Sequence, residues 1–216
     1  MENSKVLSIK EVEGNTQIIL EETIFYPQGG GQPYDQGLIW SENASFIVEA
    51  VYKTPEGIVH QGHFEKGCFE IGEYVQLQID VERRQLNSRL HSAGHLIDYV
   101  LQEMSLGWKP VKGYHYPDGA YVEYEGELSS EVEGLRKLLE EGVGEKIALN
   151  LQTRTELLGE GLRKVWFGEE YGVPCGGTHV AQLQDIGAVE IRKMRCKKGR
   201  IQVAYLVAKK SKAALY

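Results

Sequence analysis

The stretch Val81–Met104, "VERRQLNSRLHSAGHLIDYVLQEM", is where the sequence changes from one pattern to another. Its apolar side chains recur at the spacing of one face of an α-helix. These side chains are Leu86, Leu90, Ala93, Ile97 and Leu101. Asp80 can cap the start of this helix, and Gly107 followed by Pro110 marks its end. The sequence therefore predicts a long helix between two regions of different character.

The region before the helix, residues 1–82, has the pattern of β-structure. The segments "TQIILEETIFY" and "GEYVQLQIDV" alternate β-forming residues, and "DQGLIW" and "PEGIVHQG" carry turn residues. Several short strands at this spacing predict a small β-barrel or a curled sheet.

The region after the helix, residues 83–216, mixes both kinds of element. A second helix is expected from about Glu131 to Ile147, with Ser130 as its cap and Glu133 completing a capping box. Strands are expected in "LNLQTRTELL", "GAVEIRKMRC" and "RIQVAYLVA", and the last two should form a hairpin across Lys198-Gly199. The chain is thus expected to be α+β, with one domain at 1–82 and another at 83–216.

The bulk composition of the 216 residues excludes several classes of protein. Hydrophobic residues make up 42% and charged residues 25%, which is ordinary for a soluble globular protein. No apolar run approaches a membrane span, and "MENSKVLSIK" lacks the apolar core of a signal peptide. Three cysteines, Cys68, Cys175 and Cys196, cannot form a fully paired disulfide framework. A cytoplasmic protein is expected.

The charge is distributed unevenly along the chain. The net charge of −7 argues against a generic nucleic-acid binder, and residues 1–82 hold 14 acidic side chains against four basic ones. From position 192 onward there are basic residues and no acidic ones. They are Arg192, Lys193, Arg195, Lys197, Lys198, Arg200, Lys209, Lys210 and Lys212. This tail is either a solvated surface or a patch that binds phosphates; strand alternation would place Arg192, Met194 and Cys196 on one face.

Two short motifs together indicate a metal site. His91 and His95 lie four residues apart on the predicted helix, so their imidazoles share one face. The glycine-rich segment "CGGTH" adds Cys175 and His179, and its glycines let the chain turn so that both point to one centre. Each pair alone is weak evidence, but three nitrogens and one sulfur form a set that suits Zn²⁺. His60, His63 and His115 lack this arrangement and are expected at the surface or in packing.

The metal does not by itself define a reaction. A zinc peptidase of the HExxH type needs glutamate after the first histidine, where this chain has Ser92. Four protein ligands can also make a purely structural site. Gly94, a glycine inside a helix, is explained either by space for a ligand beside the metal or by a close helix crossing.

A third feature is the glycine-rich stretch "FYPQGGGQPYDQG" from Phe25 to Gly37. It is neither a P-loop nor a dinucleotide fingerprint, because its glycines are consecutive and no Gly-Lys-Ser/Thr follows. Gly29, Gly30 and Gly31 could bring backbone amides close to a small polar group, with Gln28 and Gln32 beside them. The alternative is a mobile β-turn.

In this order, "FYPQGGGQPYDQG", "RLHSAGHLI" and "CGGTHVAQLQDIGAVEI" resemble the alanyl-tRNA editing proteins, which include the free-standing AlaX proteins and the editing domain of alanyl-tRNA synthetase. The glycine-rich stretch points to the medium-length AlaX type. The resemblance implies an N-terminal β-barrel and a C-terminal α+β editing domain with an antiparallel sheet and two main helices. It implies one zinc held by His91, His95, Cys175 and His179. It also implies hydrolysis of tRNA(Ala) mischarged with serine or glycine.

The chain departs from these relatives at Gly94, where they often carry threonine, and this bears on substrate preference. An editing enzyme must spare alanyl-tRNA, which lacks only the hydroxyl of serine, so a hydrogen bond to that hydroxyl is the effective discriminator. Ser92, Gln32 and Thr178 are candidates for this contact, although Thr178 could equally serve its own turn. Lys197, Lys198 and Arg200 are candidates for tRNA phosphate contacts. A zinc-stabilised RNA-binding module without catalysis and a zinc hydrolase of a small ester or amide remain as alternatives.

Overall fold

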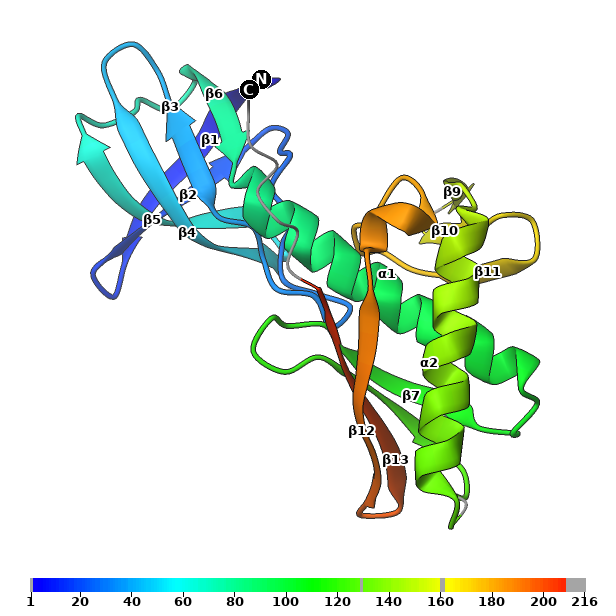
Figure 1. The fold of residues 1–216 in the computed structure, drawn as a ribbon. Coiled ribbons are helices and arrows are strands. Elements are labelled where there is room, and N and C mark those ends of the chain that lie inside the picture. Colours follow the sequence, from blue (N-terminus) through cyan, green and yellow to red (C-terminus); the bar gives the residue numbers. More distant parts are fainter. Residues whose placement is uncertain (1, 129, 160–161, 209–216) are drawn as a thin grey trace, which may run out of the picture. The chain divides into compact units, whose positions relative to one another are not determined.

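The computed structural model describes residues 2–128, 130–159 and 162–208, and Figure 1 shows their secondary structure. The chain divides into two compact units. The first comprises residues 1–29 and 33–85, and the second comprises residues 30–32 and 86–216. The division thus falls inside the long helix α1, Val81–Glu103, and assigns the tripeptide Gly30–Gln32 to the second unit.

The first unit is a closed antiparallel barrel of six strands in the order β1-β2-β5-β4-β3-β6, as predicted for a small barrel. The strands are β1 Glu2–Val12, β2 Asn15–Leu20, β3 Gly37–Trp40, β4 Ser45–Thr54, β5 Gly57–Lys66 and β6 Tyr74–Ile79. Burial alternates strictly along β2, so Ile18 and Leu20 point into the barrel and their neighbours do not. The pairing of β1 with β6 closes the barrel and leaves no free edge.

His60 is buried in this barrel, as a packing residue rather than a ligand. Its Nδ1 lies 3.1 Å from the Ile18 carbonyl oxygen and its Nε2 lies 2.8 Å from Thr23 Oγ1. Burial is the main cause that lowers the pKa of His60 to about 4. The imidazole is therefore neutral at pH 7 in the folded chain.

This burial predicts an acid dependence of stability. The unfolded imidazole, with a pKa near 6.5, takes up a proton more readily than the folded one, so stability is full above about pH 6.5 and falls as the pH drops toward 4. At pH 5 the loss from this group is about 2 kcal/mol. Urea midpoints at pH 7 and pH 5 should differ less for His60→Gln than for the parent. The matched control is His63→Gln at an exposed position, and an unchanged pH dependence in His60→Gln would contradict the expectation.

The second unit contains two antiparallel sheets and two helices. The helices are α1 and α2 Val132–Leu149, with a short 3-10 helix η1, Leu183–Ile186. A four-stranded sheet has the order β12-β13-β8-β7, and a three-stranded sheet has the order β11-β10-β9. The strands are β7 Lys109–Tyr114, β8 Tyr121–Glu125, β9 Thr153–Gly159, β10 Leu162–Phe167, β11 Tyr171–Pro174, β12 Val189–Lys197 and β13 Arg200–Val207.

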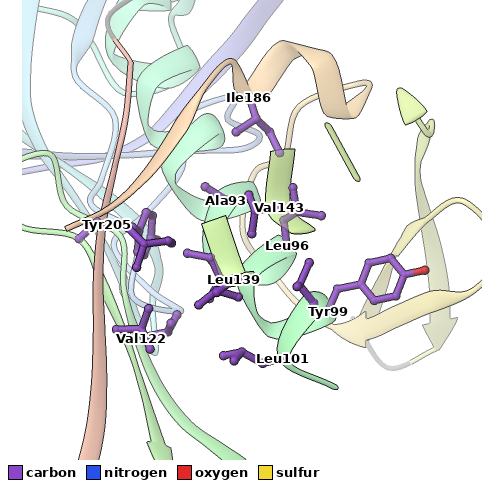
Figure 2. Close-up of a cluster of buried hydrophobic side chains, with 14 of the residues drawn as sticks. Ala93, Leu96, Tyr99, Leu101, Val122, Leu139, Val143, Ile186 and Tyr205 are labelled. Carbon is purple, nitrogen blue, oxygen red and sulfur yellow. The ribbon is translucent and has the colours of Figure 1, made fainter. Parts of the chain in front are cut away.

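One continuous apolar core joins these elements. Figure 2 shows it with side chains from α1 (Ala93, Leu96), β8 (Val122), α2 (Val143) and β13 (Tyr205) pointing toward one another. The helices approach closely, because a Cβ at Gly142 would lie 2.8 Å from Val100 Cγ1. α1 is thus held on its apolar side, which fixes the direction of its remaining side chains. Neither helix, over the described residues, has an apolar stretch long enough to cross a membrane.

Several local predictions can be compared directly. Asp80 caps α1, since its Oδ1 accepts a hydrogen bond of 3.0 Å from Arg83 N. The β12–β13 hairpin is confirmed, and Lys198 and Gly199 both have positive φ, as its two-residue turn requires. The predicted capping box of α2 is wrong. The helix begins one residue later, with Glu131 at the N-cap and no side-chain cap, and Glu133 instead forms an ion pair with Arg136.

Candidate metal centre

α1 brings His91 and His95 together on one face, one turn apart. Their rings are stacked with centroids 5.0 Å apart and an interplanar angle of 17°. His91 is almost completely buried, and His95 is partly exposed. The helix is anchored here by its packed apolar side, so the two rings have little freedom to separate.

The loop after β11 brings Cys175 and His179 to the same point. Cys175 Sγ lies 3.3 Å from Nε2 of His91, of His95 and of His179. All four ligand atoms lie within 4.8 Å of one another. Zinc–sulfur and zinc–nitrogen bonds of normal length at a tetrahedral angle place sulfur and nitrogen about 3.5 Å apart. The four side chains therefore fit a single metal ion and could hold one.

Of the two glycines of this loop, Gly177 is required by proximity rather than by an unusual torsion angle. A Cβ at Gly177 would lie 2.1 Å from Cε1 of His91, a distance at which one of the two must move. A Cβ at Gly176 would meet nothing closer than an Arg163 nitrogen at 3.8 Å. The loop therefore reaches the helix only because position 177 has no side chain.

The hydrogen bond to the second ring nitrogen of His91 selects the tautomer that a metal needs, and the hydroxyl at the second ring nitrogen of His179 is compatible with the same tautomer. His91 Nδ1 lies 2.8 Å from Gln32 Oε1, and His179 Nδ1 lies 3.2 Å from Ser92 Oγ. With the proton on Nδ1, each histidine presents the lone pair of Nε2 to the centre. This arrangement is the one found around histidine ligands in metal sites, where an outer partner orients the ring.

Burial also favours neutral imidazoles at this centre. It is the main cause that lowers the pKa of His95 to about 4, and it lowers the pKa values of His91 and His179 well below their usual range. Burial raises the pKa of the Cys175 thiol, while the Gly177 amide and Arg163 act in the opposite direction. A bound cation would favour the thiolate. The histidines are thus already in the neutral form that binds a metal. The Cys175 thiol, in contrast, needs the positive charge of the metal to favour its thiolate form.

The structure gives Gln32, Ser92 and Thr178 protein partners. Gln32 is fully buried, and besides His91 it contacts Thr178, whose N donates to Oε1 at 3.0 Å and whose Oγ1 accepts from Nε2 at 2.9 Å. Thr178 Oγ1 also lies 2.7 Å from Ser88 Oγ. Ser92 Oγ accepts from Val180 N at 3.1 Å in addition to its contact with His179. These three side chains therefore hold the ligand-bearing segments in place.

A cavity of about 430 Å³ opens beside the metal centre, within the second unit. Among its lining residues are the ligands His91, His95 and Cys175 and the polar side chains Asp98, Lys112, Glu123 and Tyr124. Gly30 lines it as well, whereas Gln32, Ser92 and Thr178 are not part of its lining. Asp98 lies one turn beyond His95 on the same face of α1, and its Oδ2 accepts hydrogen bonds from Tyr171 and Gln102. A small polar molecule can thus lie next to the metal ligands.

The glycine-rich loop is an ordered part of the fold. Its ends are tied by reciprocal bonds: Tyr26 N donates to Asp35 Oδ2 at 2.7 Å, and Asp35 N donates to the Tyr26 carbonyl at 3.0 Å. Gly31, with φ of +75°, approaches β7 so closely that a Cβ would lie 2.3 Å from the Gly113 oxygen. Gly29 belongs to the first unit, where its carbonyl accepts from Tyr26. The loop brings Gln32 to His91 and places Gly30 in the cavity lining, and a role of its glycines in holding a small polar group stays a prediction.

Gly94 lines the cavity beside the candidate metal ligands, and its missing side chain also makes room for two neighbouring side chains. A Cβ at this position would lie 2.4 Å from Cε1 of His115 and 2.9 Å from the Tyr205 hydroxyl. His115 is buried, stacks on His91 with centroids 4.5 Å apart, and hydrogen-bonds through Nδ1 to Tyr205 at 2.6 Å. The space beside the helix is therefore filled by a histidine that supports a ligand ring.

The close contact at Gly94 predicts a coupled effect on stability. Gly94→Ala should lower the free energy of unfolding by about 1 kcal/mol. The steric overlap of the new methyl group costs more free energy than the higher helix propensity of alanine contributes. In a His115→Ala background, which removes the closest contact, this cost should disappear. Urea unfolding of the four proteins of the cycle gives the coupling. An equal cost of Gly94→Ala in both backgrounds would contradict this explanation.

Sequence reasoning did not identify His115 or Asp98 as parts of this region. Asp98 could have been found from helical spacing, because it lies seven residues after His91 on the same face. His115 carries no such signal, because it reaches the centre from the loop after β7.

Comparisons with known proteins identify relatives along most of the chain. Residues 1–83 match the family model described as tRNA synthetases class II (A). The alanyl-tRNA editing protein AlaX-M of Pyrococcus horikoshii is 35% identical over 188 residues, which cover 84% of this chain and 82% of that protein.

Two further relatives are longer than this chain. AlaX-L of the same organism is 28% identical over 88% of this chain, which spans 50% of that protein's length. The alanine–tRNA ligase of Neorickettsia sennetsu is 33% identical over 86% of this chain and 24% of the ligase. The match to AlaX-M extends over most of both proteins. The chain therefore belongs to the AlaX family of alanyl-tRNA editing proteins.

Proposed function

We propose that this protein is a zinc-dependent deacylase that hydrolyses the ester bond of tRNA(Ala) mischarged with serine or glycine. The observation that carries the proposal is the convergence of three imidazoles and one thiol, of which His91, His95 and Cys175 line a cavity of about 430 Å³. The names of its relatives, two alanyl-tRNA editing proteins and an alanine–tRNA ligase, support the choice of substrate.

His91, His95, Cys175 and His179 would hold the zinc, because their donor atoms converge and three nitrogens with one sulfur suit this metal. When bound, zinc supplies a positive charge that can polarise an ester carbonyl, lower the pKa of a water or orient the substrate. Gln32 keeps His91 in the tautomer that leaves Nε2 free, and the hydroxyl of Ser92 is compatible with the same tautomer of His179. We assign Gln32 and Ser92 positioning roles, since their hydrogen bonds are made to protein partners.

The cavity offers polar partners to an aminoacyl ester. Such an ester carries an α-ammonium group, and the carboxyl groups of Asp98 and Glu123 are in the lining. Burial and the Asp98 carboxylate raise the pKa of Tyr124 well above its usual range, so its hydroxyl stays protonated and can donate. Val111, Val122 and Val173 add apolar side chains to the lining.

Discrimination between serine and alanine requires a polar contact. A site that binds the serine hydroxyl can reject the analogue without it by about 10⁴-fold or more, because its own polar group is then left unpaired. Asp98 and Tyr124 replace Ser92, Gln32 and Thr178 as our candidates for this contact, because they line the cavity.

The test is deacylation of purified seryl-, glycyl- and alanyl-tRNA(Ala) by the zinc-loaded protein. We expect release of serine and glycine and sparing of alanine. Seryl-tRNA(Ala) that stays intact but is retarded by the protein would indicate an RNA-binding module without catalysis. Seryl-tRNA(Ala) that is neither bound nor cleaved, with turnover of a small ester, would indicate an unrelated hydrolase. Either result would overturn the proposal.

A further inference from the structure

A second cavity, of about 580 Å³, lies in the same unit at one end of the four-stranded sheet. The loop between β7 and β8 forms one side of it, with Tyr116, Asp118 and Tyr121 in the lining. Strands β12 and β13 form the other side. The basic residues of the lining are Arg192, Arg195 and Lys197. The deacylase proposed above makes no use of this cavity.

Three tyrosines beside this cavity form a continuous stack. The rings of Tyr114 and Tyr116 lie 4.3 Å apart at 13°, and those of Tyr114 and Tyr121 lie 5.1 Å apart at 17°. All three rings are only partly buried. Parallel aromatic rings that remain accessible can extend their stack to a nucleic-acid base, and such stacking works with any base.

The register of the sheet places positive charge next to this stack. Arg195 pairs with Gln202 across β12–β13, and Ala204 pairs with Tyr121 across β13–β8, so these side chains share one face of the sheet. A bulge between Ile191 and Lys193 leaves Arg192 outside the regular alternation. The expectation that Arg192 shares a face with Met194 and Cys196 is therefore wrong, since Met194 is buried while Arg192 is exposed and lines the cavity.

These cations are available to a ligand. Within the described part of the chain, Arg195 donates its hydrogen bonds to the neutral Gln202 amide oxygen, at 3.0 and 2.7 Å. Among the described residues no carboxylate lies within 4.0 Å of Arg195 or Lys197. Arg192 pairs with Glu190 at 2.7 Å, but both are about half exposed, and such pairs contribute little in water. Asp118 is the single acid in the lining, so the local charge is positive.

The cavity is close to the metal centre. Tyr205 lines it, and the Tyr205 hydroxyl lies 2.6 Å from His115 Nδ1. His115 in turn stacks on the ligand His91. Two side chains thus separate the cavity from the metal ligands.

We infer that this cavity binds an unpaired nucleotide of the RNA 3′ end, with its base stacked on the tyrosines and its phosphate near Arg195 and Lys197. The inference rests on the proposed function, because it takes the RNA as the substrate's carrier. The match is one of chemistry: a planar π-system for the base and unpaired cations for the phosphate. The inference keeps Lys197 among the expected phosphate contacts and replaces Lys198 and Arg200 with Arg195 on β12. Lys198 lies in the exposed hairpin turn, and Arg200 is 3.6 Å from Glu125. Lys209, Lys210 and Lys212 lie outside the described residues.

The test uses uncharged tRNA(Ala), either intact or lacking its unpaired 3′ nucleotides, so that no hydrolysis is involved. Tyr116→Ala should weaken binding of the intact RNA by roughly 10-fold, as for loss of one stacked base, and leave the shortened RNA unaffected. The double variant Arg195→Gln/Lys197→Gln should reduce the salt slope for the intact RNA by roughly one unit per lost phosphate contact. A control double variant, Lys10→Gln/Lys137→Gln, removes the same charge at exposed positions of β1 and α2. Zinc content and urea midpoints check that each variant is folded.

These binding measurements test the cavity independently of the proposed deacylase activity. Parent-like binding by Tyr116→Ala, or an equal loss on intact and shortened RNA, would overturn the inference. A parent protein that binds the intact RNA through these residues but leaves seryl-tRNA(Ala) uncleaved would refute the deacylase and retain the cavity.

Discussion

Replacing Gly177 with alanine should remove most of the bound zinc, whereas the same change at the neighbouring Gly176 should have no effect. The new methyl group at position 177 would lie 2.1 Å from Cε1 and 2.3 Å from Nδ1 of His91. That ring cannot move aside, because it is buried, stacked against His95 and His115, and bonded to Gln32. The loop must retreat instead, and it carries Cys175 and His179 with it. We expect zinc affinity to fall by at least about 100-fold.

Competition with a zinc chelator measures this effect, and the pair of variants provides its own control. Gly176 and Gly177 are adjacent and neither has positive φ, so the two substitutions differ mainly in the contact they create. Equal zinc affinity in the two variants would show that His91 is not positioned as described.

Cys175→Ala should strongly weaken zinc binding and with it the deacylation of seryl-tRNA(Ala). The sulfur lies 3.3 Å from each of three imidazole nitrogens and is the only donor of the set that is charged when bound. Its loss leaves three neutral nitrogens, and we expect affinity to fall by at least about 100-fold. Elemental analysis of the purified protein measures the metal directly.

Two other cysteines serve as controls for this experiment. Cys68 and Cys196 are exposed and free, so Cys68→Ala and Cys196→Ala should keep one zinc per chain. Stoichiometric zinc in Cys175→Ala would remove the basis for the metal centre and for the proposed chemistry.

The parts of the fold that could be predicted are those recorded in local patterns. The alternation of Ile18 and Leu20 in β2, the helical spacing around Leu90 and the Lys198-Gly199 turn are each determined by neighbouring residues. The start of α2 could not be placed as well, because the choice of cap among neighbouring polar residues depends on tertiary contacts. Arg136, on the first turns of α2, donates to the Ile191 carbonyl at 2.8 Å, and this contact helps to set where the helix lies.

The candidate site likewise has a part that local sequence patterns predict and a part that depends on tertiary contacts. The convergence of His91, His95, Cys175 and His179 was predicted because each pair has its own short spacing. Gln32 and His115 lie 59 and 24 residues away from His91 in the sequence. The periodicity of a helix or a strand does not relate residues that are so far apart, so it could not predict their roles. Gln32 in particular had the polar character of a substrate contact. Only its complete burial and its three hydrogen bonds to His91 and Thr178 distinguish a residue that supports a candidate ligand.

The assignment of Gly30–Gln32 to the second unit has a consequence for how this protein can be divided and inherited. A fragment that begins at residue 86 keeps all four candidate metal ligands but loses the amide that receives the His91 proton. The barrel therefore cannot be exchanged for another domain by a single crossover in the gene without removing the hydrogen-bond acceptor of His91 Nδ1. Recombination that preserves function must transfer the glycine-rich loop together with the helix, so the two segments form one heritable unit although some fifty residues separate them in the chain.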